Sequence, residues 1–336
     1  MITANRGRAQ PAAAPTWQAL WRDAVTDPAE LLVLVDLADR TDLVAPRDTG
    51  FALRVPRGFV ARMRRGDPAD PLLRQVLPLA AELDRVPGYA RDAVGDLAAR
   101  SAHGVLQKYQ GRALLIATGS CAVNCRYCFR RHFPYAEETA AANRWQAALA
   151  AIAADPTIDE AILSGGDPLS LSNAKLGEFC TAIAAMPHVR RVRIHTRLPI
   201  VLPERVDAGL AGLVAALPQR VAVVVHANHA NEIDDTVAAA CRRLADAGAT
   251  LLNQSVLLAG VNDDADALAT LSERLFEAGV LPYYLHQLDR VDGAAHFAVD
   301  DAAALALVDA LRRRLPGYLV PKLVREIAGE ASKTPL

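Results

Sequence analysis

The sequence has little excess charge, few lysines and no long apolar runs. Its 336 residues carry 37 Lys and Arg against 38 Asp and Glu, a formal net charge of -1, whereas a dedicated nucleic-acid-binding protein usually has a basic excess. No apolar run approaches the roughly 18–20 residues of a membrane span, and the N-terminal residues lack the apolar segment of a signal peptide. These absences predict a cytoplasmic protein that contacts neither nucleic acid nor membrane.

Arginine supplies nearly all of the positive charge. The four lysines are Lys108, Lys175, Lys322 and Lys333, so chemistry that needs a lysine amine has few candidates. Hydrophobic residues make up 52% of the chain and charged residues 22%, values typical of globular proteins, which excludes wholesale disorder.

Composition and periodicity divide the chain into four parts. Residues 1–16 are rich in Ala, Pro, Gly and Arg and are predicted to form a loose tail. Residues 17–104 show helical apolar spacing without a cluster of chemically active residues, and we expect a helical preface there. Residues 105–290 alternate strand and helix patterns, and residues 291–336 are expected to form a separate C-terminal segment.

Short apolar strands alternate with helical spacing from about residue 110 onward. The expected strands are Ala113–Ala117, Ala161–Ser164, Val189–His195, Val221–His226, Leu251–Leu258 and Tyr283–Leu288. The expected helices include Pro71–Leu83, Ala140–Ala153, Asn173–Ala185, Arg205–Ala216, Asp234–Ala247 and Ala265–Ala278. Repeats of roughly 30 residues with this alternation predict a parallel sheet covered on both faces, either an open doubly wound sheet or an incomplete barrel.

Polar motifs stand at or just after the ends of successive strands. They read CAVNCRYC, SGGDP, HTR, HANH and HQLD, and Gln254 lies within the fifth strand. An open sheet concentrates its ligand residues near one switch point, whereas a barrel draws them from every loop at its C-terminal face. The distribution predicts an α/β fold built on a partial (βα)6, TIM-like barrel.

Three cysteines, Cys121, Cys125 and Cys128, form a C-x3-C-x2-C motif directly after the first of these strands. Thiolate is a soft ligand for iron–sulfur clusters or zinc, and three cysteines can hold a 4Fe-4S cluster that keeps one iron open. The alternatives are a zinc site closed by His132 and three packed thiols. Two further cysteines lie in helical patterns and are expected in the core.

The cysteine motif in this setting resembles the radical S-adenosylmethionine (SAM) superfamily, in which SAM binds the open iron and is cleaved to a 5′-deoxyadenosyl radical. The turn Ser164, Gly165, Gly166 and Asp167 resembles the glycine-rich element that holds the SAM amino group in that family. Two glycines let the backbone approach a ligand closely. Taken alone, the same residues also fit an ordinary strand-to-helix turn.

Further segments are similar to the lysine 2,3-aminomutases within that superfamily. They are CRYCFRRHFPY, RIHTRLPIVLP, HANHANEI and NQSVLLAGVND. In that family the glutamine of the last segment, Gln254 here, contacts SAM, and His195 and His226 fall in the same expected polar site. By this match, Arg130 would bind the carboxylate of the substrate. A guanidinium can bind a carboxylate through two hydrogen bonds. A solvated basic loop is the alternative for Arg130 and its neighbouring arginines.

The resemblance also implies pyridoxal 5′-phosphate (PLP), which requires a lysine as its Schiff-base partner. The run GYLVPKLVREIAGEASKTP aligns without gaps to the C-terminal run of the family and gives this role to Lys333 in preference to Lys322. By the same match, Tyr109 and Arg112 belong to the PLP pocket. Asp289 and Glu326 match the two carboxylates that bind the side-chain ammonium of the substrate, although free-standing enzymes have aspartate at the second position.

The resemblance extends over roughly residues 17–336 and is strongest to one branch. The segments VTDPAELL, FALRVPRGFVARM and DPADPLLRQVLP resemble enzymes that supply (R)-β-lysine for modification of translation elongation factor P. The resemblance therefore implies an isomerase for L-lysine with a 4Fe-4S cluster, SAM and PLP. It further implies an electron donor of the flavodoxin or ferredoxin type and an elongation factor P ligase that uses the product.

Three alternatives stay open at this point. One is a free-standing aminomutase for lysine or a related amino acid that feeds a β-amino-acid pool. A second is a radical SAM enzyme without PLP. A third is a non-enzymatic protein that binds an iron–sulfur cluster or zinc.

Overall fold

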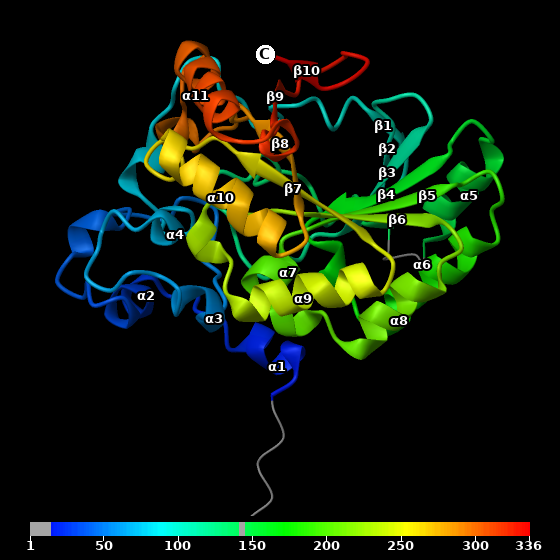
Figure 1. Cartoon of the computed structure of the whole chain (residues 1–336), viewed down its shortest axis with the longest axis horizontal. Helices are drawn as coiled ribbons and strands as arrows, with labels where there is room; N and C mark the ends of the chain where they lie inside the picture. The colour runs from blue at the N-terminus through cyan, green and yellow to red at the C-terminus, as the bar shows by residue number, and fades with distance from the viewer. Residues whose placement is uncertain (1–14, 141–144) are drawn as a thin grey trace, which may run out of the picture.

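The computed structural model describes residues 15–140 and 145–336 and contains one sheet of ten described strands (Figure 1). The parallel strands are β3 (Arg112–Thr118), β4 (Glu160–Gly165), β5 (Arg191–Thr196), β6 (Arg220–Val225), β7 (Thr250–Val256), β8 (Leu281–His286) and β9 (Lys322–Arg325). Antiparallel strands β1 (Arg100–Ala102), β2 (Val105–Leu106) and β10 (Thr334–Pro335) form the two edges. Of the predicted loose tail, residues 1–14 lie outside the described residues.

The strands follow one another across the sheet in chain order. A doubly wound sheet has a point at which this order reverses, and no such reversal occurs between the described strands. The α/β fold with a partial TIM-like barrel is therefore confirmed, and all six predicted strands are present as β3 to β8. The sheet continues beyond residue 290, because β9 pairs in parallel with β8.

Helices cover the outer face of the barrel (Figure 1). They are α5 (Gln146–Ala154), α6 (Asn173–Ala184), α8 (Ala208–Ala216), α9 (Asp235–Asp246), α10 (Ala265–Glu277) and α11 (Asp301–Arg314). The last five each begin after a serine or aspartate whose side-chain oxygen accepts a hydrogen bond from the first turn, which satisfies free amides at the helix start. None of the described helices combines the length and hydrophobicity needed to cross a membrane.

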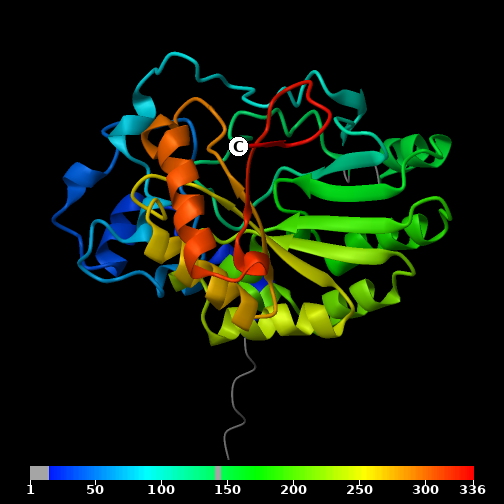
Figure 2. The ribbon, with the colours of Figure 1, turned by 45° about the horizontal axis from the view of Figure 1, so that its top comes forward.

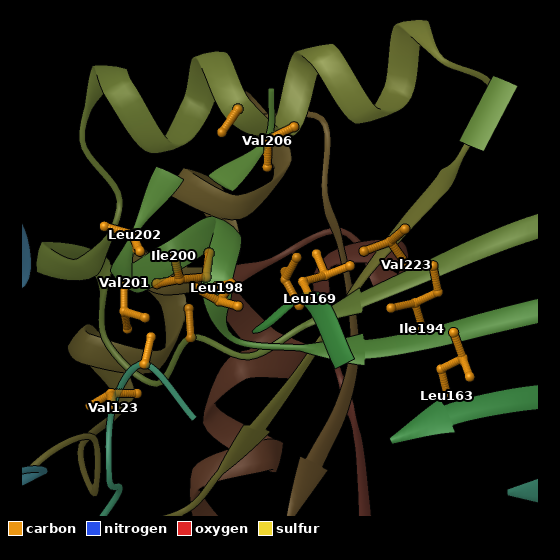
Figure 3. Close-up of a cluster of buried hydrophobic side chains, with 14 of the residues drawn as sticks. Val123, Leu163, Leu169, Ile194, Leu198, Ile200, Val201, Leu202, Val206 and Val223 are labelled. Atoms are coloured by element: carbon orange, nitrogen blue, oxygen red, sulfur yellow. The ribbon is translucent and has the colours of Figure 1, made fainter. Parts of the chain in front are cut away.

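Apolar side chains fill the space between the central strands and the short helix α7 (Leu198–Val201). Figure 3 shows Leu163, Ile194 and Val223, from three adjacent strands, with the residues of α7. Val123, which lies between two of the motif cysteines, is part of the same buried cluster. The hydrophobic core thus extends to the base of the cysteine loop.

The α-helices of the N-terminal region are short and separated by loops. They are α1 (Trp17–Arg22), α2 (Pro28–Leu34), α3 (Arg57–Val60) and α4 (Pro71–Arg74), and the region also contains the 3-10 turns η1 (Thr41–Leu43) and η2 (Ala80–Leu83) and strand β1. The prediction of one helix over Pro71–Leu83 was wrong, because the helix ends at Arg74 ahead of Pro78, a residue that cannot donate a helical hydrogen bond.

The two edges of the sheet leave the barrel open on one side. No described strand of one edge pairs with a strand of the other. Figure 2 shows the red C-terminal segment, from β9 to β10, close to the segment that precedes β3, and an ion pair between Lys108 and Glu326 joins the two. We call this side of the barrel the seam.

Candidate active site

A cavity of about 390 Å³ lies within the barrel toward the C-terminal ends of its strands. Every residue that the sequence assigns to a site lines it. They are Tyr109, Arg112, Cys121, Cys125, Cys128, Arg130, Ser164, Gly165, Gly166, Asp167, His195, His226, Gln254, Asp289, Glu326 and Lys333. The volume is typical of small-molecule sites. The structure therefore brings the predicted residues together, and their individual roles stay predictions.

The cysteine loop is anchored by the apolar core and by the N-terminal region. Val123 enters the apolar core (Figure 3), and the backbone amide of Asn124 donates to the Arg54 carbonyl oxygen at 3.0 Å. The Asn124 side chain donates to the Ala52 carbonyl oxygen at 2.9 Å. The N-terminal region therefore helps to fix the position of the three cysteines.

Two arginines of the cysteine loop turn away from the cavity toward Glu82. The Glu82 carboxylate accepts a hydrogen bond from Arg126 Nε at 2.7 Å and from Arg131 Nη2 at 2.7 Å, and all three side chains are buried. The interpretation of a solvated basic loop was therefore wrong for these arginines. Glu82 belongs to the N-terminal region, so this region holds the cysteine loop through buried ion pairs.

The three thiols line one wall of the cavity. Within the described part of the chain, no group of three His, Cys, Asp or Glu side chains converges closely enough to hold a single metal ion. His132, the fourth ligand of the zinc alternative, has its Nε2 3.2 Å from the carbonyl oxygen of Asp292. Burial raises the pKa of the Cys128 thiol to about 11, and metal coordination would deprotonate it. Three soft donors along one cavity wall fit an iron–sulfur cluster.

Arg197, at the end of β5, reaches the thiol of Cys125. Its Nη1 lies 2.7 Å from Cys125 Sγ and 2.6 Å from the Tyr127 hydroxyl. Its Nη2 donates to Gln75 at 2.7 Å and to Glu232 at 2.9 Å. Burial disfavours the guanidinium charge, yet Cys125, Tyr127 and Glu232 together raise the pKa of Arg197 well above its ordinary value. A fixed cation therefore stands beside a predicted cluster ligand, a role that the HTR motif alone did not reveal.

The glycine-rich turn packs against the backbone of the cysteine loop. Gly165 has a φ of +109°, and a Cβ added at Gly166 would lie 2.6 Å from the Ser120 carbonyl oxygen. The Gly166 amide donates to the Thr118 carbonyl oxygen at 2.7 Å. The close approach of the two loops, in addition to any approach to a ligand, therefore requires glycine at both positions.

Asp167 is buried at the start of the 3-10 turn η4 (Pro168–Ser170). Its carboxylate accepts four hydrogen bonds, from Thr196 Oγ1 and from the amides of Leu169, Arg197 and Leu198. Burial raises the pKa of Asp167, and these hydrogen bonds oppose the rise. The carboxylate thus joins the ends of β4 and β5, and its contact with the SAM amino group stays a prediction.

The two histidines and the glutamine predicted to line the SAM site come from three neighbouring strands. His195 lies in β5, His226 directly follows β6 and Gln254 lies in β7. Burial, followed by the positive charge of Arg197, lowers the pKa of His226 to about 3. Burial and then Arg193 lower the pKa of His195 well below its ordinary value, so both rings are neutral near neutral pH. Gln254 Oε1 is buried without a hydrogen-bond partner within the described part of the chain. Because buried polar atoms are normally paired, this oxygen fits a ligand that carries a hydrogen-bond donor.

Five charged side chains form a continuous chain of ion pairs along the seam. Arg130 Nε lies 2.6 Å from Asp96 Oδ2, and Asp96 Oδ1 lies 2.7 Å from Lys108 Nζ. The same Lys108 Nζ is 2.9 Å from Glu326 Oε1, and Glu326 Oε2 is 2.6 Å from Lys333 Nζ. The predicted carboxylate-binding arginine is therefore connected to the predicted PLP lysine through three residues.

The two carboxylates predicted to bind an ammonium differ in their pKa. Burial disfavours the ionised form of Glu326, but the ammonium groups of Lys333 and Lys108 outweigh it and hold the pKa at about 2. Burial and the nearby Glu326 carboxylate raise the pKa of Asp289 to about 7. No ion pair or side-chain hydrogen bond to Asp289 occurs among the described residues. Asp289 is thus an unpaired carboxyl group, among the described residues, that changes its charge near neutral pH, whereas Glu326 beside it stays charged.

The residues expected to hold PLP gather near the seam. The guanidinium of Arg112 stacks 5.0 Å from the Tyr109 ring centroid and has no ion pair with any described residue. The Nε of the neighbouring Arg193 is buried without a hydrogen-bond partner in the described part of the chain, and both arginines line the cavity with Lys333. Arg193 is already paired with Glu160 through Nη2 at 2.8 Å, so Arg112 is the guanidinium that, with a lysine amine, fits a phosphate-bearing aldehyde cofactor.

Among the cavity residues that the sequence did not assign to a site are Asp96, Lys108 and His286. Asp96 lies in the N-terminal region without any motif, and Lys108 and His286 precede or end a strand. Lys108 is one of the four lysines and adjoins Tyr109, a signal that could have identified it. His286 is the first residue of the HQLD motif, and its buried Nε2 has no hydrogen-bond partner within the described residues.

Comparison with known proteins gives close relatives along nearly the whole chain. An L-lysine 2,3-aminomutase from Escherichia coli (strain K12) is 51% identical over 322 residues, which cover 95% of this chain and 94% of the relative. An L-lysine 2,3-aminomutase from Haemophilus influenzae is 45% identical over 320 residues, again 95% of this chain and 94% of the relative.

Among solved structures, a radical SAM methyltransferase from Sphaerobacter thermophilus is similar with a TM-score of 0.46 and 19% identity. The similarity covers 66% of this chain and 68% of that structure. No family model matches the sequence.

Proposed function

The chain belongs to the lysine 2,3-aminomutase family of radical SAM enzymes, and on that premise we propose that it converts L-α-lysine to (R)-β-lysine. The reaction moves the amino group from C2 to C3 of the same molecule, so the protein is an isomerase. The observation that carries the proposal is the pair of carboxylates, Glu326 and Asp289, in the same cavity as Arg130 and the cysteine loop.

A 4Fe-4S cluster and SAM belong to this family, and we propose PLP as the third group. When bound, these groups supply the one-electron chemistry that removes and returns a substrate hydrogen and the conjugated ring that lets nitrogen migrate. Cys121, Cys125 and Cys128 would hold the cluster. Lys333 would hold PLP, with Arg112 at its phosphate.

The charged side chains of the cavity account for a diamino acid as substrate. Arg130 carries a charge stabilised by Asp96, and its remaining donors suit the carboxylate of an amino acid. Glu326 already accepts two alkylammonium groups, from Lys108 and Lys333. A substrate ammonium can take the position of Lys333 once that amine has been taken up by PLP, with Asp289 as the second carboxylate.

Neutral and apolar groups form a part of the wall. The rings of His195 and His226 are uncharged near neutral pH, because burial lowers their pKa. Val224 and Val225 add apolar surface from β6. A wall of this kind excludes water and proton donors that would quench a reactive intermediate.

A comparison of substrates tests the proposal. The anaerobically reconstituted protein, loaded with iron, sulfide and PLP, is given SAM, a reductant and either L-lysine or L-norleucine, which lacks the distal ammonium. We expect β-lysine by mass spectrometry and no comparable conversion of norleucine. Equal turnover of both would contradict the role of Glu326 and Asp289. Lysine turnover in protein without PLP would contradict the role of PLP.

We also propose that the product serves modification of translation elongation factor P, with electrons from a flavodoxin- or ferredoxin-type donor in the cytoplasm. The similarity of the N-terminal segments to that branch supports this assignment over a free-standing enzyme that feeds a β-amino-acid pool. Purified elongation factor P and its ligase, added to the reaction, should acquire a mass increase of one β-lysyl group. A product of S configuration, or one that the ligase rejects, would favour the free-standing enzyme.

A further inference from the structure

Lys108 occupies the centre of the seam, where its ammonium donates two hydrogen bonds and forms an ion pair with Asp96. Its Nζ lies 2.8 Å from the carbonyl oxygen of Val94, 2.7 Å from Asp96 Oδ1 and 2.9 Å from Glu326 Oε1. The hydrogen bonds go to the Val94 carbonyl and to Glu326, and the contact with Asp96 is an ion pair. The side chain is only 18% exposed, so water does not compete freely for these positions.

Each carboxylate that Lys108 holds directs its other oxygen toward a residue of the proposed reaction. Asp96 Oδ2 accepts from Arg130 Nε at 2.6 Å, and Glu326 Oε2 accepts from Lys333 Nζ at 2.6 Å. Lys108 therefore stands between the group that would bind the substrate carboxylate and the group that would bind the substrate ammonium.

The position of Lys108 in the fold gives this arrangement a further consequence. Lys108 precedes β3 at one edge of the sheet and Glu326 follows β9 near the other edge, and the described strands of these two edges are not paired. Hydrogen bonds of a sheet cannot hold the two edges in register at this point. The ammonium of Lys108 does so instead, through one contact on each side of the seam.

Charge balance supports a role for Lys108 beyond that of a structural contact. Glu326 has two cationic partners in the structure, Lys108 and Lys333. Formation of a bond between Lys333 and PLP would remove one of them, and Lys108 would remain as the permanent cation on Oε1. Only the Oε2 atom of Glu326 would then be free to bind another ammonium. Glu326 could therefore bind one substrate ammonium, and only on the side of Oε2.

We propose that Lys108 is a positioning residue that sets Glu326 and, through Asp96, Arg130 at a fixed spacing for the two charged ends of a diamino acid. The inference rests on the proposed function and deepens it. Lys108 itself does not touch the substrate, and it acts by holding the two groups that do.

Steady-state kinetics of the loaded enzyme test this inference. Lys108→Met keeps the unbranched apolar stem of the side chain and removes its charge, and Lys108→Arg keeps the charge. Lys322→Met removes an exposed lysine as the matched control. We expect Lys108→Met to raise the KM for lysine roughly 10- to 100-fold, the loss of one hydrogen bond to a charged group, with a much smaller change in kcat. Lys108→Arg should restore most of the affinity, and Lys322→Met should leave both constants unchanged.

Cofactor content and SAM affinity separate positioning from a folding defect. Each variant is assayed for PLP absorbance, iron content and the dissociation constant of SAM, which should all match the wild type. An unchanged KM in Lys108→Met, or a loss of kcat and PLP together without a rise in KM, would overturn the inference alone. Absence of lysine turnover in the wild type would overturn the proposed function and the inference with it.

Discussion

The ammonium of Lys333 lies 2.6 Å from Glu326 Oε2. The lysine predicted to hold PLP is therefore paired with the carboxylate predicted to bind the substrate ammonium. An alkylammonium group thus already occupies the position expected for the distal ammonium of lysine. If Lys333 holds PLP as proposed, its amine would leave that position to the substrate. The proposal therefore predicts that PLP binds before lysine.

The order of binding predicts an unusual effect of removing Lys333. In protein without PLP, Lys333→Met should bind L-lysine several-fold more tightly than the wild type, because Glu326 Oε2 is no longer occupied. Isothermal titration calorimetry measures this directly, with Lys322→Met as the control. Weaker binding by Lys333→Met would show that the two ammonium groups do not compete for Glu326.

Neutralisation of Glu326 should weaken lysine binding more than catalysis. Glu326→Gln keeps the shape of the side chain and removes its charge, which Lys333 and Lys108 maintain by holding the pKa of Glu326 at about 2. We expect the KM for lysine to rise roughly 10- to 100-fold, while the dissociation constant of SAM stays the same. A parallel loss of SAM affinity would mean that the substitution disturbs the cavity as a whole.

Asp289 should make lysine turnover dependent on pH. Burial and Glu326 raise its pKa to about 7, so the carboxyl is neutral below that pH and charged above it. Because the lysine side chain is cationic throughout this range, kcat/KM should increase between pH 6 and pH 8. The pH profile of the free enzyme reports this group, and Asp289→Asn should abolish the part of the rise centred near pH 7. A profile unchanged by the substitution would assign the rise to another group.

Arg197 should raise the reduction potential of the cluster. A cation 2.7 Å from Cys125 Sγ stabilises the reduced cluster, which carries one more negative charge, over the oxidised one. Arg197→Met should lower the midpoint potential by roughly 60 mV or more, the one-electron equivalent of a tenfold change in equilibrium constant. A redox titration followed by electron paramagnetic resonance measures the shift, and the exposed Arg190→Met is the control. Equal potentials in wild type and Arg197→Met would contradict this role.

Glu82 should stabilise the cysteine loop from the N-terminal region. It forms buried ion pairs with Arg126 and Arg131, and removal of one partner of a buried pair costs about 3–5 kcal/mol. Urea unfolding of Glu82→Gln should show a loss of this order and poorer retention of iron. Glu30→Gln, which breaks an exposed pair with Arg57, should change the free energy of unfolding by about 1 kcal/mol or less. Similar effects of both substitutions would argue against a special role of Glu82.

The sequence was sufficient for the repeating part of the fold. Apolar periodicity predicts the strands and helices from β3 to α10. The motifs HTR, HANH and HQLD mark the polar residues at the ends of the strands. This succeeds because each βα unit is a local pattern whose strand end is fixed by the geometry of a parallel sheet. The cysteine motif and Lys333 follow from spacing and resemblance, and the structure places them in one cavity.

The parts that the sequence did not predict depend on contacts between distant segments. Lys108 and Glu326 are separated by more than two hundred residues and meet only because the barrel brings its two edges together. Glu82 lies in the 3-10 turn η2 and Asp96 in a loop, and no local pattern shows which partner either carboxylate will meet. Pro78 did signal the end of a helix, and apolar spacing on both sides of it concealed the break.

Formation of β-lysine by the fully reconstituted protein is the most direct test of the account. The protein is loaded with iron, sulfide and PLP without oxygen, given SAM, a reductant and L-lysine, and the products are followed by mass spectrometry. We expect β-lysine from the wild type and from Lys322→Ala, and none from Lys333→Ala or Cys125→Ala. Cleavage of SAM to deoxyadenosine without β-lysine would contradict lysine as the substrate, and β-lysine formation by Lys333→Ala would contradict the PLP site.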